Sequence, residues 1–166
     1  RLICYFNHRL RLEISVTNTD SKTLPLSWAL HSYHPVEDIQ HARIMGLDGC
    51  GYLDNTKHLQ RHIQSGDIVF EGEVDRVFVD APLAQILVQR PASATLPQSG
   101  LKVFATGSDT AIIWNPGIKK AANMLDLGVE YQSDFVCLER GNALDNALAL
   151  EPQQCHRAAL EVELFS

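Results

Sequence analysis

The chain has 166 residues, of which 45% are hydrophobic and 20% are charged, as is typical of one folded globular domain. The net charge of -6 argues against a nucleic-acid-binding protein, because phosphate backbones favour clustered lysine and arginine. No apolar run approaches the roughly 20 residues that a membrane-spanning helix needs, and no export signal is evident. We therefore expect a single cytoplasmic domain over residues 1–166 that binds neither nucleic acid nor membrane.

Apolar and polar residues alternate with a period of two along much of the chain, which predicts β-strands. In the first such segment Leu10, Leu12, Ile14 and Val16 alternate with polar residues, as in a strand with one wet face. Turn residues separate the segments at intervals typical of an all-β, antiparallel sandwich. The further predicted strands are Leu24–Tyr33, Asp67–Phe70, Val74–Val79, Gln85–Gln89, Leu101–Ala105, Ala111–Trp114 and Phe135–Leu138.

Helical signals are weak. Residues 118–124 could form a short helix after Pro116, and residues 57–63 are ambiguous between helix and strand. Residues 91–100 are expected to form an exposed loop. The four widely spaced cysteines contain no CxxC pair, which favours reduced thiols over a disulfide framework or a zinc site.

The predicted strand Leu24–Tyr33 places its large apolar residues on one face and His31 and Tyr33 on the other, among small residues. Small neighbours leave room above a sheet, and an imidazole beside a phenol could contact a polar ligand there. The alternative is a histidine on a solvated face. Periodicity alone favours that alternative.

Glu139 ends an apolar run and precedes Arg140 and Gly141. Burial at such a position would raise the pKa of the carboxyl group and make Glu139 a useful base near neutral pH. The alternative is a surface ion pair that contributes little to stability. Asp75 could accept hydrogen bonds from vicinal hydroxyl groups, or it could pair with Arg76 or cap a turn.

Metal-binding patterns are poor. His31 and His34 are three residues apart on a predicted strand and would point to opposite faces. His58 and His62 would converge only on a helix, and no third ligand lies nearby. The glycine-rich run Gly46–Gly51 has turn character and lacks the spacing of a phosphate-binding loop. We expect no metal and no organic cofactor.

Five ordered blocks between about Arg11 and Ala143 resemble the glucose-6-phosphate 1-epimerase (hexose-6-phosphate mutarotase) group of the galactose-mutarotase-like superfamily. The blocks are Leu30–Tyr33 with Val36–Ile39, Gly46–Asp54 (GLDGCGYLD), Glu73–Phe78 (EVDRVF), Ile113–Pro116 (IWNP) and Val136–Ala143 (VCLERGNA). The resemblance implies a β-sandwich of the supersandwich type.

The resemblance also implies roles for individual residues. His31 would be the general acid that protonates the ring oxygen of a hexose 6-phosphate, and Glu139 the base that takes the proton from the anomeric hydroxyl. Asp75 would hold sugar hydroxyls, and Tyr33 would contact the same substrate. The implied reaction interconverts α and β anomers by ring opening and reclosure. The alternative is a carbohydrate-binding pseudoenzyme or an inactive fragment.

Three positions depart from the family pattern. His34 replaces an aromatic residue and could make one wall of the site more polar, and Gly117 replaces a tryptophan. Arg140 follows Glu139 directly, and pairing would lower the basicity of the carboxylate. We expect strand alternation to point Arg140 away.

The chain also resembles the C-terminal part of the family fold. The N-terminal strands of that fold, which carry the basic phosphate-binding residues of the family, are expected to be missing from this chain. The missing strands should leave sheet edges and apolar residues exposed, so we expect association through those edges or with a separate N-terminal segment.

Overall fold

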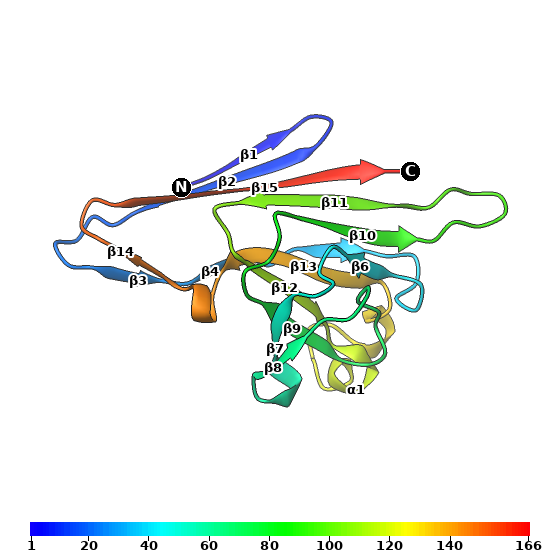
Figure 1. Cartoon of the computed structure of the whole chain (residues 1–166). Helices are drawn as coiled ribbons and strands as arrows, with labels where there is room; N and C mark the ends of the chain where they lie inside the picture. The colour runs from blue at the N-terminus through cyan, green and yellow to red at the C-terminus, as the bar shows by residue number, and fades with distance from the viewer.

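The computed structural model describes residues 1–166, which form antiparallel sheets with very little helix (Figure 1). The first sheet has six strands in the order β1-β2-β15-β11-β10-β6. They are β1 (Leu2–Phe6), β2 (Leu10–Thr17), β15 (Cys155–Phe165), β11 (Ser99–Thr106), β10 (Ala84–Arg90) and β6 (Arg43–Met45).

The second sheet has the order β4-β13-β12-β9-β7-β8, and β5 pairs with β13 on the same side as β4. Its strands are β4 (Trp28–Leu30), β5 (Tyr33–Pro35), β13 (Phe135–Asn142), β12 (Thr110–Asn115), β9 (Val74–Phe78), β7 (Gly51–Asp54) and β8 (Gln60–Ile63). The short strands β3 (Leu24–Leu26) and β14 (Leu148–Leu150) form a separate pair. The remaining elements are the helix α1 (Gly117–Ala121) and three 3-10 turns, Asn55–Lys57, Val129–Tyr131 and Leu144–Asn146.

One continuous cluster of buried hydrophobic residues joins the two sheets. Val136 and Leu138 of β13 and Ile113 of β12 enter it from the second sheet, and Val103 and Leu160 enter it from the first. Because side chains alternate along a strand, Cys137 and Glu139 must then point to the opposite face of the second sheet. That face carries the candidate site. The assignment of residues 1–166 to one domain stays a prediction.

The prediction of an all-β antiparallel fold is confirmed, and six predicted strands correspond to β2 and β9 to β13. The prediction for Asp67–Phe70 is wrong, because Ile68 makes only an isolated bridge to Ile44. Residues 60–63 form β8 and not a helix, and α1 is shorter than residues 118–124. The loop predicted over residues 91–100 ends at residue 98, because β11 begins at Ser99.

The predicted continuous strand Leu24–Tyr33 is wrong, because this segment is divided into β3, β4 and β5. Leu24, one of the large apolar residues that the predicted strand placed together on one face, is 38% exposed. At the break between β4 and β5 the hydroxyl of Ser32 donates a hydrogen bond of 2.7 Å to the carbonyl oxygen of Leu138. The hydroxyl of Ser32, and not a backbone N–H group, therefore donates to this carbonyl group of β13. His31 lies in the break instead of within a strand.

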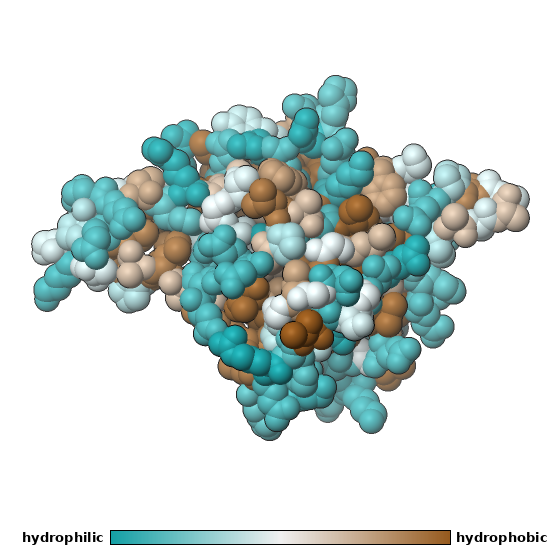
Figure 2. All heavy atoms as spheres, viewed as in Figure 1, coloured by the Kyte–Doolittle hydropathy of each residue, from teal (hydrophilic) through white to brown (hydrophobic).

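The first sheet extends beyond the second and leaves apolar side chains uncovered. Phe6 lies opposite Leu10, and Leu164 opposite Leu101, so both share a face with core residues, yet they are 85% and 75% exposed. Hydrophobic atoms also reach the surface on the face shown in Figure 2. These uncovered residues agree with the expected exposure of apolar surface, while association through them stays a prediction.

Helix α1 has five residues, and no helix of the structure is long and apolar enough to span a membrane.

Candidate active site

Strand register places a row of side chains on the face of the second sheet that points away from the core. Trp114 of β12 lies opposite Asp75 of β9 and Cys137 of β13, and Cys137 in turn lies opposite Tyr33 of β5. Opposed residues in antiparallel strands point to the same face. Glu139, two residues beyond Cys137, shares that face. The structure thus brings the predicted residues Tyr33, Asp75 and Glu139 together although they come from three different strands.

His31 joins this group from the break between β4 and β5. Its imidazole ring stacks on the ring of Tyr33, with centroids 4.7 Å apart, and meets the edge of Trp114 at 6.0 Å. Its Nε2 lies 3.3 Å from Oε1 of Glu139. The side chain of His31 is 50% exposed, whereas that of Glu139 is 4% exposed. An accessible imidazole therefore contacts a buried carboxyl group.

The environment of Glu139 changes its acidity. Burial, and secondly the negative charge of Asp75, raise the pKa of Glu139 to about 7. A carboxyl group with this pKa holds a substantial ionised fraction at neutral pH and is more basic than an exposed glutamate. Such a group is suited to general-base catalysis.

The raised pKa of Glu139 has a consequence for stability. Its ordinary value is 4.5, so between about pH 4.5 and about pH 7 the folded chain binds the proton more tightly than the unfolded chain. Rising pH therefore costs stability across this window, and the loss is complete above about pH 7. We expect the variant Glu139→Gln to lack this loss. The difference between its free energy of unfolding and that of wild type should therefore increase as pH rises.

Urea unfolding of both proteins at about pH 5 and about pH 8 measures this difference. The control is Glu37→Gln, since Glu37 is an exposed carboxylate. If the free energy of unfolding of Glu139→Gln does not increase relative to wild type between these two pH values, the raised pKa of Glu139 is contradicted.

Asp75 is partly buried, and its Oδ2 accepts a hydrogen bond of 2.8 Å from Nδ2 of Asn55. Burial raises the pKa of Asp75, while the bond from Asn55 opposes that shift. The alternative pairing with Arg76 is wrong, because Arg76 lies over the ring of Tyr52 and donates to Oε1 of Gln64. Asp75 is therefore held by a neutral partner and keeps accepting capacity for a ligand.

Arg140 points away from Glu139, as strand alternation predicted, and the alternative of a surface Glu139–Arg140 pair is wrong. The guanidinium group is buried on the core face and donates to the carbonyl oxygens of Pro82 and Ser108 and to the side chain of Gln85. It therefore does not lower the basicity of Glu139. Instead it connects β13 to two loops of the fold.

His34 also points away from the site. It follows Tyr33 on β5, is buried on the opposite face, and its Nε2 lies 3.3 Å from the carbonyl oxygen of Leu138. Burial lowers the pKa of His34. The expectation that it makes a wall of the site more polar is therefore wrong, because alternation sends it to the core side.

Three residues of the site were missed by sequence reasoning: Cys137, Trp114 and Asn55. The Sγ of Cys137 is buried and lies 3.9 Å from Nδ1 of His31, and burial raises the pKa of the thiol. A period of two along β13 was enough to place Cys137 beside Glu139. The position of Trp114 needed the register of β12, and that of Asn55 needed the turn after β7.

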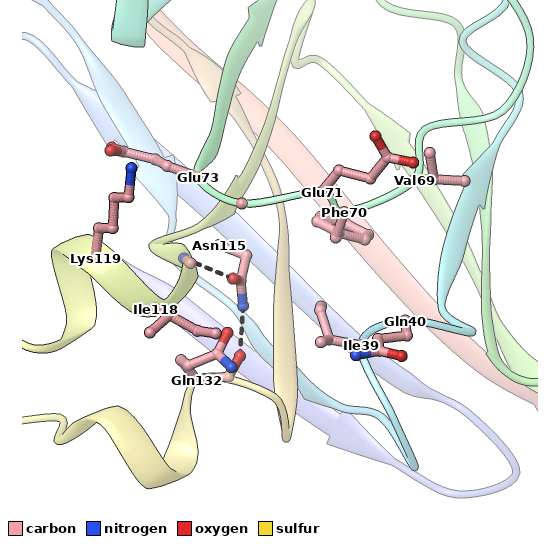
Figure 3. Close-up of a pocket in the computed structure, with 12 residues that line it drawn as sticks. Ile39, Gln40, Val69, Phe70, Glu71, Glu73, Asn115, Ile118, Lys119 and Gln132 are labelled. Carbon is pink, nitrogen blue, oxygen red and sulfur yellow. Dashed lines mark hydrogen bonds between the residues drawn. The ribbon is translucent and has the colours of Figure 1, made fainter.

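A cavity lies elsewhere, at the ends of β9 and β12 beside α1 (Figure 3). Its volume is about 830 Å³, and its lining includes Ile118, Lys119 and Glu73 but none of the four predicted site residues. Gly117 lines it with a φ of +62°, and a Cβ there would lie 2.6 Å from the backbone nitrogen of Glu73. Only glycine fits this backbone, which accounts for the glycine that replaces a tryptophan of the family pattern here.

Solved structures share this architecture. The crystal structure of "a putative mutarotase" from Salmonella typhimurium matches with a TM-score of 0.84 at 21% identity, over 98% of this chain and 52% of that chain. A "putative aldose 1-epimerase" from Escherichia coli K12 matches with a TM-score of 0.70 at 18% identity, over 95% of this chain and 56% of that chain. The fold is therefore that of the galactose-mutarotase-like β-sandwich proteins.

Sequence comparison identifies the family. The family model described as Aldose 1-epimerase matches residues 6–163. The chain belongs to the aldose 1-epimerase family. It is 35% identical over 144 residues to a "Putative glucose-6-phosphate 1-epimerase" of Cenchrus ciliaris. The matched region covers 86% of this chain and 42% of that protein. A protein of the same name from Salmonella typhimurium is 28% identical over 127 residues, covering 76% of this chain and 39% of that protein. The chain thus spans about two fifths of the length of these relatives.

Proposed function

We propose that this chain carries the acid–base centre of an isomerase that interconverts the α and β anomers of a hexose 6-phosphate, with glucose 6-phosphate as the expected substrate. One observation carries the proposal. The buried carboxyl group of Glu139, with a pKa raised to about 7, lies 3.3 Å from the accessible imidazole of His31. Membership of the aldose 1-epimerase family and the names of the relatives support the same reaction class.

The two groups divide the proton transfers. Glu139 takes the proton from the anomeric hydroxyl while His31 gives a proton to the ring oxygen, and the C1–O5 bond breaks to give the open-chain aldehyde. Rotation about C1–C2 presents the other face of the carbonyl group. The O5 hydroxyl oxygen then attacks C1 to close the ring, and His31 and Glu139 return to their first protonation states. The reaction balances without an external proton donor or cofactor.

The anomeric hydroxyl oxygen and the ring oxygen are bonded to the same carbon, so two groups 3.3 Å apart can reach both oxygens from one side of the ring. Glu139 lies on the continuous strand β13. His31 lies in a strand break and is half exposed, so its imidazole is accessible to the sugar. Its stacking partner Tyr33 is 57% exposed and offers an aromatic surface to the C–H groups of the ring.

Asp75 is proposed to accept hydrogen bonds from sugar hydroxyls and to orient the ring. Its charge also raises the pKa of Glu139. We therefore expect Asp75→Asn to weaken sugar binding and to move the acidic limb of the pH–activity profile to lower pH. A pH profile of anomer exchange for both proteins measures the shift. A weakened variant with an unmoved limb would contradict the electrostatic coupling.

Exchange NMR on the anomers of glucose 6-phosphate tests the proposed function. Acceleration of α–β exchange by the chain, above the rate in buffer, is the expected result. Glucose without phosphate serves as the matched substrate control, because no phosphate-binding residue is assigned in this chain. If the chain binds glucose 6-phosphate without accelerating exchange, the carbohydrate-binding alternative replaces the isomerase.

A further inference from the structure

His31, Cys137 and Glu139 form a cluster of three different donor types. One imidazole nitrogen, the thiol sulfur and one carboxylate oxygen all lie within 4.8 Å of one another. Cys137 and Glu139 are buried beneath the site, whereas His31 is exposed. The reaction proposed above uses His31 and Glu139 but gives the thiol of Cys137 no role.

The spacing of these atoms is close to that of a metal site. Three atoms at most 4.8 Å apart share a central point that is no more than about 2.8 Å from each, whereas zinc bonds are about 2.0–2.3 Å long. The distance of 3.3 Å between Nε2 of His31 and Oε1 of Glu139 already equals the separation of two ligands on a tetrahedral ion, which is about 3.3 Å for bonds of about 2.0 Å. A shift of less than about 1 Å per atom would complete the site.

We propose that His31, Cys137 and Glu139 bind a thiophilic divalent cation of the zinc class, with a fourth position open to water on the side of the exposed imidazole. Nitrogen, thiolate and carboxylate together are a donor set that suits such ions. The thiol loses its proton to solvent on binding, and the cation replaces that proton as the partner of the sulfur. Two anionic ligands neutralise the charge of the ion, and Asp75 adds a nearby negative charge.

The cation competes with the sugar. It occupies the same nitrogen and oxygen atoms that serve as acid and base, so a loaded chain cannot transfer protons through them. This consequence rests on the proposed function, whereas metal binding itself depends only on the three side chains. Zinc is then an inhibitor of the isomerase and not its cofactor.

Cobalt absorption tests binding without any measurement of activity. The three other cysteines are first removed as Cys4→Ser, Cys50→Ala and Cys155→Ser, so that Cys137 is the one remaining thiol. Titration of this chain with Co²⁺ should produce a thiolate-to-cobalt charge-transfer band that saturates at one equivalent. Added Zn²⁺ should remove the band and report the zinc affinity by competition. Absence of a saturating band in the folded chain would overturn the proposal.

Variants of the ligands assign the site. Cys137→Ser in the same background should abolish the band, and His31→Asn, which changes a half-exposed side chain, should weaken zinc binding by at least ~100-fold. Circular dichroism checks that each variant is folded. A band unchanged in His31→Asn would overturn the three-ligand site and leave binding through the thiol alone.

Inhibition is measured separately, by exchange NMR on glucose 6-phosphate with and without Zn²⁺. Rising sugar concentration should reverse the inhibition. If the chain binds zinc but never accelerates exchange, the metal site stands and the proposed function fails. If exchange is accelerated but zinc neither binds nor inhibits, the metal site fails and the proposed function stands.

Discussion

Glu139→Gln should slow the exchange of glucose 6-phosphate anomers by about 10²- to 10⁴-fold, the range that one general acid–base group contributes. The amide keeps the shape of the carboxyl group but cannot accept the proton of the anomeric hydroxyl. Glu139 is the buried carboxyl group that lies 3.3 Å from His31, and the proposed reaction assigns the role of base to no other group. The same exchange NMR experiment compares the two proteins at equal concentration.

Sugar binding should survive this substitution, since Asp75 and Tyr33 are unchanged, so the loss should fall on kcat more than on KM. Glu37→Gln, at an exposed carboxylate, should keep the wild-type rate. If the Glu139→Gln chain retains its exchange rate within about threefold, the base lies elsewhere and the proposed roles of Glu139 and His31 are wrong.

Arg140→Ala should lower the free energy of unfolding by about 2–6 kcal/mol, because it leaves two buried acceptors unsatisfied at about 1–3 kcal/mol each. Arg140 is 1% exposed. Its loss would leave the carbonyl oxygen of Ser108 and the amide oxygen of Gln85 without their donor, while the carbonyl oxygen of Pro82 would keep the bond from Nε2 of Gln85. Since domains of this size are stable by about 5–15 kcal/mol, the loss is a large part of the total.

Urea unfolding at a fixed pH measures the effect of Arg140→Ala. Arg157→Ala, at an exposed arginine, is the matched control and should change the stability by no more than about 0.5 kcal/mol. A change below about 1 kcal/mol for Arg140→Ala would mean that water replaces the guanidinium group, and that the arginine does not hold β13 to its neighbouring loops.

Three strands of each sheet could be predicted from the sequence, β2, β10 and β11 in the first and β9, β12 and β13 in the second, because strand alternation is a local property. The period of two correctly separated Glu139 from Arg140 and His31 from His34. The period of two gave wrong strands where tertiary contacts compete with the backbone hydrogen bonds between strands. At Ser32 a side chain replaces a backbone donor and interrupts the strand, and at Ile68 a single bridge is all that the geometry allows. No pattern predicted β15, although it pairs with both β2 and β11 in the first sheet.

The sequence by itself determined six of the strands, the family and the chemical types of the site residues. It could not determine that Glu139 is buried, that the charge of Asp75 lies close enough to raise its pKa, or that the thiol of Cys137 reaches the imidazole of His31. Those facts depend on the register of β9, β12, β13 and β5. Acidity is set by burial and by neighbouring charges from distant segments, and only the tertiary structure brings those segments together.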